Sequence, residues 1–83
     1  MAKYNVLSSE WLGEGTHRVI VESPFHGDFD TIRQGVRRAA LRSDPMGMAV
    51  RAHVDGPIEH TGRDAYGNPT GMTWVAVTYR SRY

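Results

Sequence analysis

The chain has 83 residues, of which 40% are hydrophobic and 23% charged, and its formal net charge at pH 7 is +1. These values are typical of one small globular domain, here residues 1–83, and not of a disordered chain, a strongly basic nucleic-acid binder or an acidic DNA mimic. Because the sequence contains no cysteine, disulfide bonds, cysteine-ligated metals and thiol nucleophiles are excluded.

The sequence also lacks the signals of a membrane or exported protein. No apolar run approaches the roughly 20 residues that span a bilayer. Residues 1–5 lack the apolar segment of a signal peptide. We therefore expect a cytoplasmic protein that contacts no membrane.

The first two elements are expected to be strands that pair as a hairpin. Residues 4–11 alternate imperfectly between apolar and polar side chains, and residues 16–23 are richer in β-branched residues. Gly13 and Gly15 mark a turn between them. Pro24 ends the second strand because proline cannot donate to the ladder. The two faces of that strand are expected to carry His17, Val19 and Val21 on one side, and Arg18, Ile20 and Glu22 on the other.

Residues 28–43 have the spacing of an amphipathic helix. We expect Asp28 to cap its first turn, and Pro45 to end it near Arg42 or Ser43. Gly35 lies in the interior, where glycine costs about 1 kcal/mol relative to alanine, so it marks a position where a neighbour could approach closely. The expected apolar stripe consists of Phe29, Ile32, Val36, Ala39 and Ala40.

Two further strands are expected after the helix, at residues 48–55 and 72–80. Their alternation assigns the side chains to two faces. We expect the helix side to carry Val50, Val54, Val75, Val77 and Tyr79, and the opposite side Arg51, His53, Trp74 and Arg80.

The segment between these strands, residues 56–71, contains four glycines and two prolines, which preclude a helix. It forms either a long loop or, if the two strands run on and turn at residues 66–69, a protruding β-ribbon. Both arrangements place Tyr66 near a tip.

The order strand, strand, helix, strand, strand predicts an α+β fold (ββαββ), in which one helix packs on one face of a four-stranded antiparallel sheet. A single amphipathic helix covers only one face of such a sheet. The other face is therefore left to water or to a partner.

Two surfaces are candidates for binding a partner. On the uncovered sheet face we expect Trp74 to be the anchor and the arginines to pair with acidic groups. The same set of cations and an aromatic ring also suits single-stranded nucleic acid, and an ordinary solvated surface is a third interpretation. The candidate residues are Arg51, His53, Trp74 and Arg80, joined by Tyr66 from the loop, with Arg37, Arg38 and Leu41 on the outer face of the helix as a second patch.

No catalytic pattern stands out in the sequence. The chain contains no nucleophile elbow, phosphate-binding loop or zinc-protease motif. Its four histidines lack the close spacing that zinc sites use. We therefore expect no enzyme activity, no cofactor and no metal.

The layout of hairpin 4–23, helix 28–43 and second hairpin 48–80 resembles that of small phage-encoded inhibitor proteins, including anti-CRISPR proteins. The resemblance implies a non-enzymatic protein in the host cytoplasm. Such a protein would bind a host nucleic-acid-handling complex, either a protein or a ribonucleoprotein, and block one of its sites.

The leading expectation for function is thus a small binding protein that docks on a macromolecular partner. One alternative is direct nucleic-acid binding through the arginine-rich helix or the sheet face. Another is a structural subunit of a larger assembly, or a homodimer that pairs by its edge strands.

Overall fold

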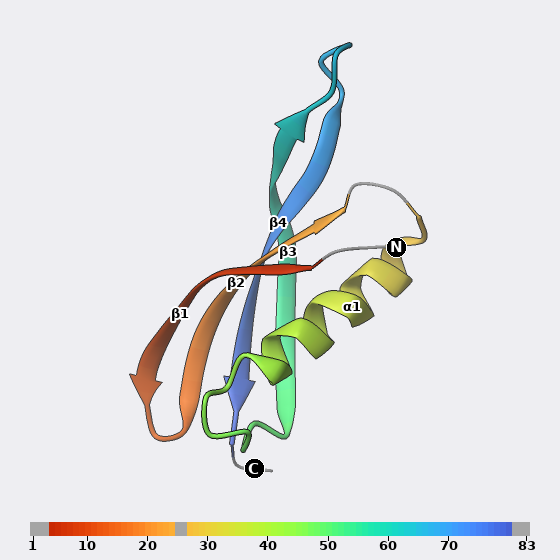
Figure 1. Cartoon of the computed structure of the whole chain (residues 1–83). Coiled ribbons are helices and arrows are strands. Elements are labelled where there is room, and N and C mark those ends of the chain that lie inside the picture. Colours follow the sequence, from red (N-terminus) through yellow and green to blue (C-terminus); the bar gives the residue numbers. More distant parts are fainter. Residues whose placement is uncertain (1–3, 25–26, 81–83) are drawn as a thin grey trace.

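The computed structural model describes residues 4–24 and 27–80, which form one antiparallel sheet with a helix lying across one of its faces (Figure 1). The strand order in the sheet is β1-β2-β4-β3. The predicted α+β class and the placement of one helix on a four-stranded sheet are confirmed. The elements in chain order are β1 (Asn5–Gly13), β2 (Thr16–Pro24), α1 (Phe29–Arg42), β3 (Arg51–Arg63) and β4 (Pro69–Tyr79).

Helix α1 begins and ends where its capping residues require. The backbone N–H of Thr31 donates to Oδ2 of Asp28 at 3.1 Å, which satisfies one of the free donors of the first turn. At the other end, the backbone N–H of Ser43 donates to the carbonyls of Ala39 and Ala40. The predicted helix bounds are therefore confirmed at both ends.

The core lies between α1 and the helix-facing side of the sheet. Ile32, Val36 and Ala40 are buried on the helix, and they pack in one cluster with buried side chains of three strands. The largest of these is Trp74, which has no exposed surface and donates from its indole Nε1–H to Oγ of Ser23 at 2.7 Å. The strand residues of the cluster are Val19, Val21, Val54, Met72, Trp74 and Ala76.

The face assignment predicted for the last strand is wrong. Trp74 pairs with Val21 in the neighbouring strand, and both are buried beneath α1. Val75, Val77 and Tyr79 therefore lie on the uncovered face of the sheet. Because apolar residues occupy both faces of this strand, alternation alone could not orient it, whereas burying the large indole stabilises the fold most.

Strands β3 and β4 continue well past the body of the sheet as a two-stranded ribbon (Figure 1). They turn at residues 64–68, where Oδ1 of Asp64 accepts from the backbone N–H groups of Tyr66 and Asn68 at 2.8 and 3.0 Å. Tyr66 is 90% exposed at the tip. Of the two arrangements expected for residues 56–71, the structure has the ribbon.

Gly35 lies where the ring of Tyr4 packs against α1. A Cβ added at Gly35 would come within 2.7 Å of Cε1 of that ring and even closer to Cζ. The glycine in the helix interior is therefore explained by the close approach of the tyrosine, which covers one edge of the core.

We expect Gly35→Ala to lower the free energy of unfolding by about 1–3 kcal/mol, because the added methyl group forces the ring of Tyr4 out of place. In a Tyr4→Ala background the same change should instead raise it by about 1 kcal/mol, since alanine is the better helix former. Urea unfolding of the four proteins measures this coupling. Equal effects of Gly35→Ala in both backgrounds would contradict the proposed steric cause.

Candidate partner-binding surfaces

The candidate residues predicted for the uncovered sheet face do not all lie there. Trp74 belongs to the core, so its expected role as an interface anchor is wrong. Arg80 is also misplaced, because it lies on the helix side, where it pairs with Asp44. Arg51 and His53 do lie on the uncovered face, since they pair with Tyr79 and Val77 of β4.

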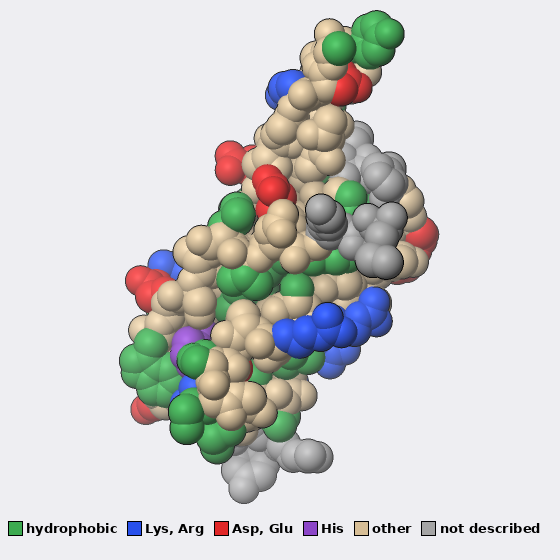
Figure 2. All heavy atoms as spheres, viewed as in Figure 1, with side chains coloured by type: hydrophobic (Ala, Val, Ile, Leu, Met, Phe, Trp, Pro, Cys, Tyr) green, Lys and Arg blue, Asp and Glu red, His purple; other side chains and the backbone are tan. Residues whose placement is uncertain are grey.

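The remaining candidates are spread over two other places. Tyr66 lies at the ribbon tip. Arg37 and Arg38 are exposed on α1, whereas Leu41 is half-buried beside them. Figure 2 shows basic side chains in a row over α1. The predicted set therefore does not form one surface.

The uncovered sheet face carries an apolar strip with charged residues around it. Ile20, Val75 and Val77 are only partly exposed. The charged side chains nearby already interact within the chain: Arg18 binds Glu10, the guanidinium of Arg51 lies 4.3 Å from the ring centroid of Tyr79, and Nε2 of His53 lies 3.1 Å from Oδ1 of Asp55. A partner docking here would have to compete with these contacts.

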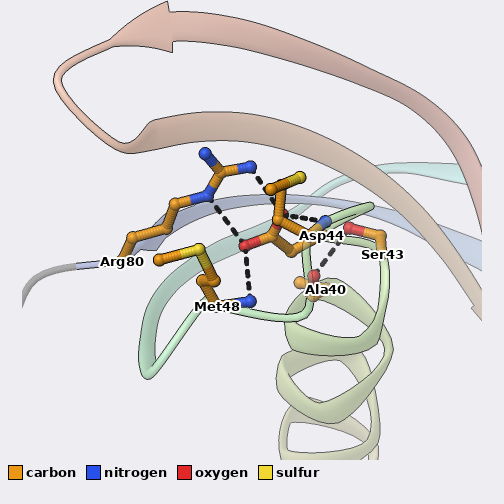
Figure 3. Close-up of polar contacts among 6 residues, drawn as sticks. Ala40, Ser43, Asp44, Met48 and Arg80 are labelled. Carbon is orange, nitrogen blue, oxygen red and sulfur yellow. Dashed lines mark hydrogen bonds and ion pairs between the residues drawn. The ribbon is translucent and has the colours of Figure 1, made fainter.

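A partly buried ion pair lies at the opposite end of the molecule from the ribbon tip. Arg80 donates from Nε and Nη2 to the two carboxylate oxygens of Asp44, at 3.0 and 2.7 Å. The backbone N–H groups of Met46 and Met48 donate to the same oxygens at 3.0 and 3.1 Å (Figure 3). This arrangement ties the connection between α1 and β3 to the end of β4.

The environment of Asp44 strongly favours its charged form. The hydrogen bonds from Arg80 hold the pKa of the Asp44 carboxyl well below its usual range, and the backbone donors of Met46 and Met48 add to this. Burial acts in the opposite direction but is outweighed. The same contact raises the pKa of the Arg80 guanidinium.

Large apolar side chains are exposed around this ion pair. Trp11 is 54%, Met46 65% and Met48 52% exposed. The guanidinium of Arg80 lies 5.2 Å from the ring centroid of Trp11, which connects β1 to the loop that carries the methionines. Figure 2 shows apolar side chains gathered at this end of the molecule. We call this surface the Trp–Met patch, and its apolar members are Trp11, Leu12, Met46, Met48 and Val50.

Sequence reasoning did not identify the Trp–Met patch. Its parts come from β1 and from the segment before β3, and Arg80 brings them together from the end of β4. A usable signal was the run Asp44-Pro45-Met46-Gly47-Met48, in which two methionines alternate with turn-forming residues. Methionines in a turn are poorly placed for a core, so they indicate a surface role.

Comparisons with protein-family models, curated proteins and solved structures found no match for this chain. Within residues 4–24 and 27–80, no cluster of acidic and histidine side chains could hold a metal ion. The single helix in the same residues is too short and too polar to cross a membrane. Function is therefore inferred from the surfaces of the fold.

Proposed function

We propose that this is a non-enzymatic binding protein that docks on a partner protein through the Trp–Met patch. The observation that carries the proposal is the gathering of five exposed large apolar side chains at one end of a small domain. Exposed apolar side chains that gather at one end of a small domain are costly in water and mark interaction sites. Tryptophan and arginine are the residues that most often dominate binding energy, and methionine adapts its shape to a partner.

The ion pair beneath the patch supports this role. Because Asp44 fixes both the side chain of Arg80 and the backbone of Met46 and Met48, the loop loses little freedom on binding. A surface that is ordered in advance binds more tightly for the same contact area. The neighbouring Trp11 offers a rigid ring of large area beside it.

Among the expected partners, a protein fits the patch better than a nucleic acid. The patch is apolar, and the arginine within it is already bound to a carboxylate. If the protein is an inhibitor of a host nucleic-acid-handling complex, as its layout implies, the contact would be with a protein component of that complex. Blocking would then result from occupying that component's surface.

The proposal is tested by measuring whether variants of the Trp–Met patch lose a partner that the unchanged protein binds. The tagged chain is used to capture proteins from a lysate of its source cells, and the captured protein is then titrated against purified variants. We expect Trp11→Ala with Met48→Ala to weaken binding at least about 30-fold, which corresponds to truncating a strong anchor. Circular dichroism should show that the double variant remains folded.

The matched control replaces an exposed aromatic and an exposed aliphatic residue of the ribbon, as Tyr66→Ala with Ile58→Ala. This variant should bind like the unchanged protein, since the ribbon tip and the patch lie at opposite ends of a molecule 44 Å long. Equal recovery with both double variants would disprove docking through the patch. Light scattering at several concentrations shows whether the captured partner is a second copy of the chain.

A further inference from the structure

A second surface, separate from the Trp–Met patch, lies between α1 and the start of β1. It is a groove of about 500 Å³. The small side chain of Ala39 lies along its floor, beside the place where the ring of Tyr4 packs on Gly35. The residues that line it are Tyr4, Val6, Gly35, Arg38, Ala39, Arg42 and Ser43.

The groove is positively charged. Arg38 and Arg42 are both exposed, and neither makes a hydrogen bond or ion pair with another residue of the described ranges. None of the lining residues is acidic. By contrast, Arg33 on the same helix donates to the backbone carbonyl of Val54 at 3.2 Å. Two arginines that make no such contact within residues 4–24 and 27–80, beside apolar walls, favour a ligand that supplies carboxylates.

The spacing of Arg38 and Arg42 matches the spacing of alternate side chains on an extended chain. Residues four apart on a helix are separated by about 6 Å along its axis, and side chains two apart on an extended strand are separated by about 6.6 Å. An acidic residue, any residue and a second acidic residue therefore match Arg38 and Arg42 one to one. The adjacent β1 is an edge strand of the sheet, so an extended segment can lie alongside its backbone.

We infer that this groove binds an extended acidic segment of a partner protein. The carboxylate of one residue would bind Arg38, and the carboxylate two residues further along the segment would bind Arg42. Tyr4 and Val6 form the apolar wall against which the intervening backbone packs. A nucleic acid fits less well, because the first turn of the same helix carries Asp30 and is capped by Asp28. These carboxylates would repel a phosphate backbone that follows α1.

Fluorescence anisotropy with synthetic peptides tests the inference on the full chain. The probe is a labelled peptide of Thr, Ser and Val with Glu-x-Glu at its centre. The control probes carry Gln-x-Gln, or Glu-x-x-Glu, whose carboxylates point to opposite sides of an extended chain. We expect each control peptide to bind at least about tenfold more weakly, because Glu-x-x-Glu loses one charge-assisted contact and Gln-x-Gln loses both.

Variants of the chain locate the site. Arg38→Gln and Arg42→Gln should each weaken the Glu-x-Glu peptide about tenfold. Arg37→Gln removes the same charge from the neighbouring residue, outside the groove, and should change the affinity by less than about twofold because exposed charges are screened.

Three results would overturn the inference. The first is equal binding of the Glu-x-Glu and Gln-x-Gln peptides, including the case in which neither binds. The second is an equal loss from all three arginine variants, which would indicate diffuse attraction. The third is tighter binding of a single-stranded oligonucleotide that displaces the peptide, which would assign the groove to nucleic acid. None of these results bears on the Trp–Met patch, since the two surfaces share no residue.

Discussion

Trp74→Ala is expected to cause the largest loss of stability of any single substitution in the core. The indole is completely buried, lies 5.4 Å from the ring of Phe29 between ring centroids, and fills the centre of the only layer between helix and sheet in the described chain. Removing such a side chain costs about 3–5 kcal/mol. A domain of this length has a total stability on the order of 4–12 kcal/mol, so this loss amounts to at least about a quarter of the total and, at the lower end of the range, to all of it.

Thermal and urea unfolding of Trp74→Ala measure this loss. The matched control is Trp11→Ala, which removes the other tryptophan of the chain from an exposed position and should lower the unfolding free energy by less than about 1 kcal/mol. If the two variants lost equal stability, the placement of Trp74 in the core would be contradicted.

The contribution of the indole hydrogen bond to the free energy of unfolding can be measured separately from the contribution of the indole's volume. Ser23→Ala leaves the buried Nε1–H without its acceptor and should cost about 1–3 kcal/mol. In a Trp74→Phe background, where no such donor exists, Ser23→Ala should cost much less. A double-mutant cycle on these variants isolates the contact between the two side chains.

The position of Trp74 also shows where sequence reasoning succeeds and where it stops. The helix was predictable because its signals are local: Asp28 caps it and Pro45 prevents its continuation. The orientation of β4 was not, because Val75 and Val77 on one face are as apolar as Trp74 and Ala76 on the other. Only pairing with Val19 and Val21 of β2, more than fifty residues earlier, decides which face is covered.

The sequence did not decide between a loop and a β-ribbon at residues 56–71, for a related reason. Gly56 and Pro57 are strand breakers, yet β3 passes through them because residues 56–58 together lie opposite Trp74 alone. β3 is an edge strand, where the missing N–H of a proline need not disrupt the ladder. Whether a strand is at an edge depends on strand order, which local patterns do not contain.

The Trp–Met patch depends even more on long-range contacts. From its local sequence, Arg80 is interpreted as a cation at the end of a strand, and Asp44 is interpreted as the residue that follows a helix. Their ion pair joins residues 36 positions apart and turns both into parts of a scaffold. Arg37 and Arg38 are exposed on α1 as expected for its outer face, but the groove beside Arg38 depends on the position of Tyr4.

We expect Asp44→Asn to be the most destabilising conservative substitution at the end of the molecule that carries the Trp–Met patch. The amide keeps the shape of the carboxylate but presents only one acceptor oxygen, so at least one donor among Arg80, Met46 and Met48 loses its partner. Because Asp44 is buried, that donor is also shielded from water. We expect the melting temperature to fall by at least about 5 °C, and partner binding through the Trp–Met patch to weaken with it.

The pH dependence of stability separates the charge of Asp44 from its shape. The folded-state pKa of this carboxyl lies below its ordinary value of 3.8, so its contribution to the free energy of unfolding is present above that value and is lost as the pH falls toward the folded pKa. The unfolding free energy of the unchanged protein should therefore decline from about pH 5 downward, and that of Asp44→Asn should decline less steeply.

Asp64 also has a lowered pKa, caused by the backbone donors of the ribbon turn, so Asp64→Asn serves as the comparison. Asp64→Asn should remove only the contribution of that turn and leave the melting temperature at neutral pH nearly unchanged, because the turn lies far from the core. An acid profile of Asp44→Asn as steep as that of the unchanged protein would show that the ion pair with Arg80 does not stabilise the fold.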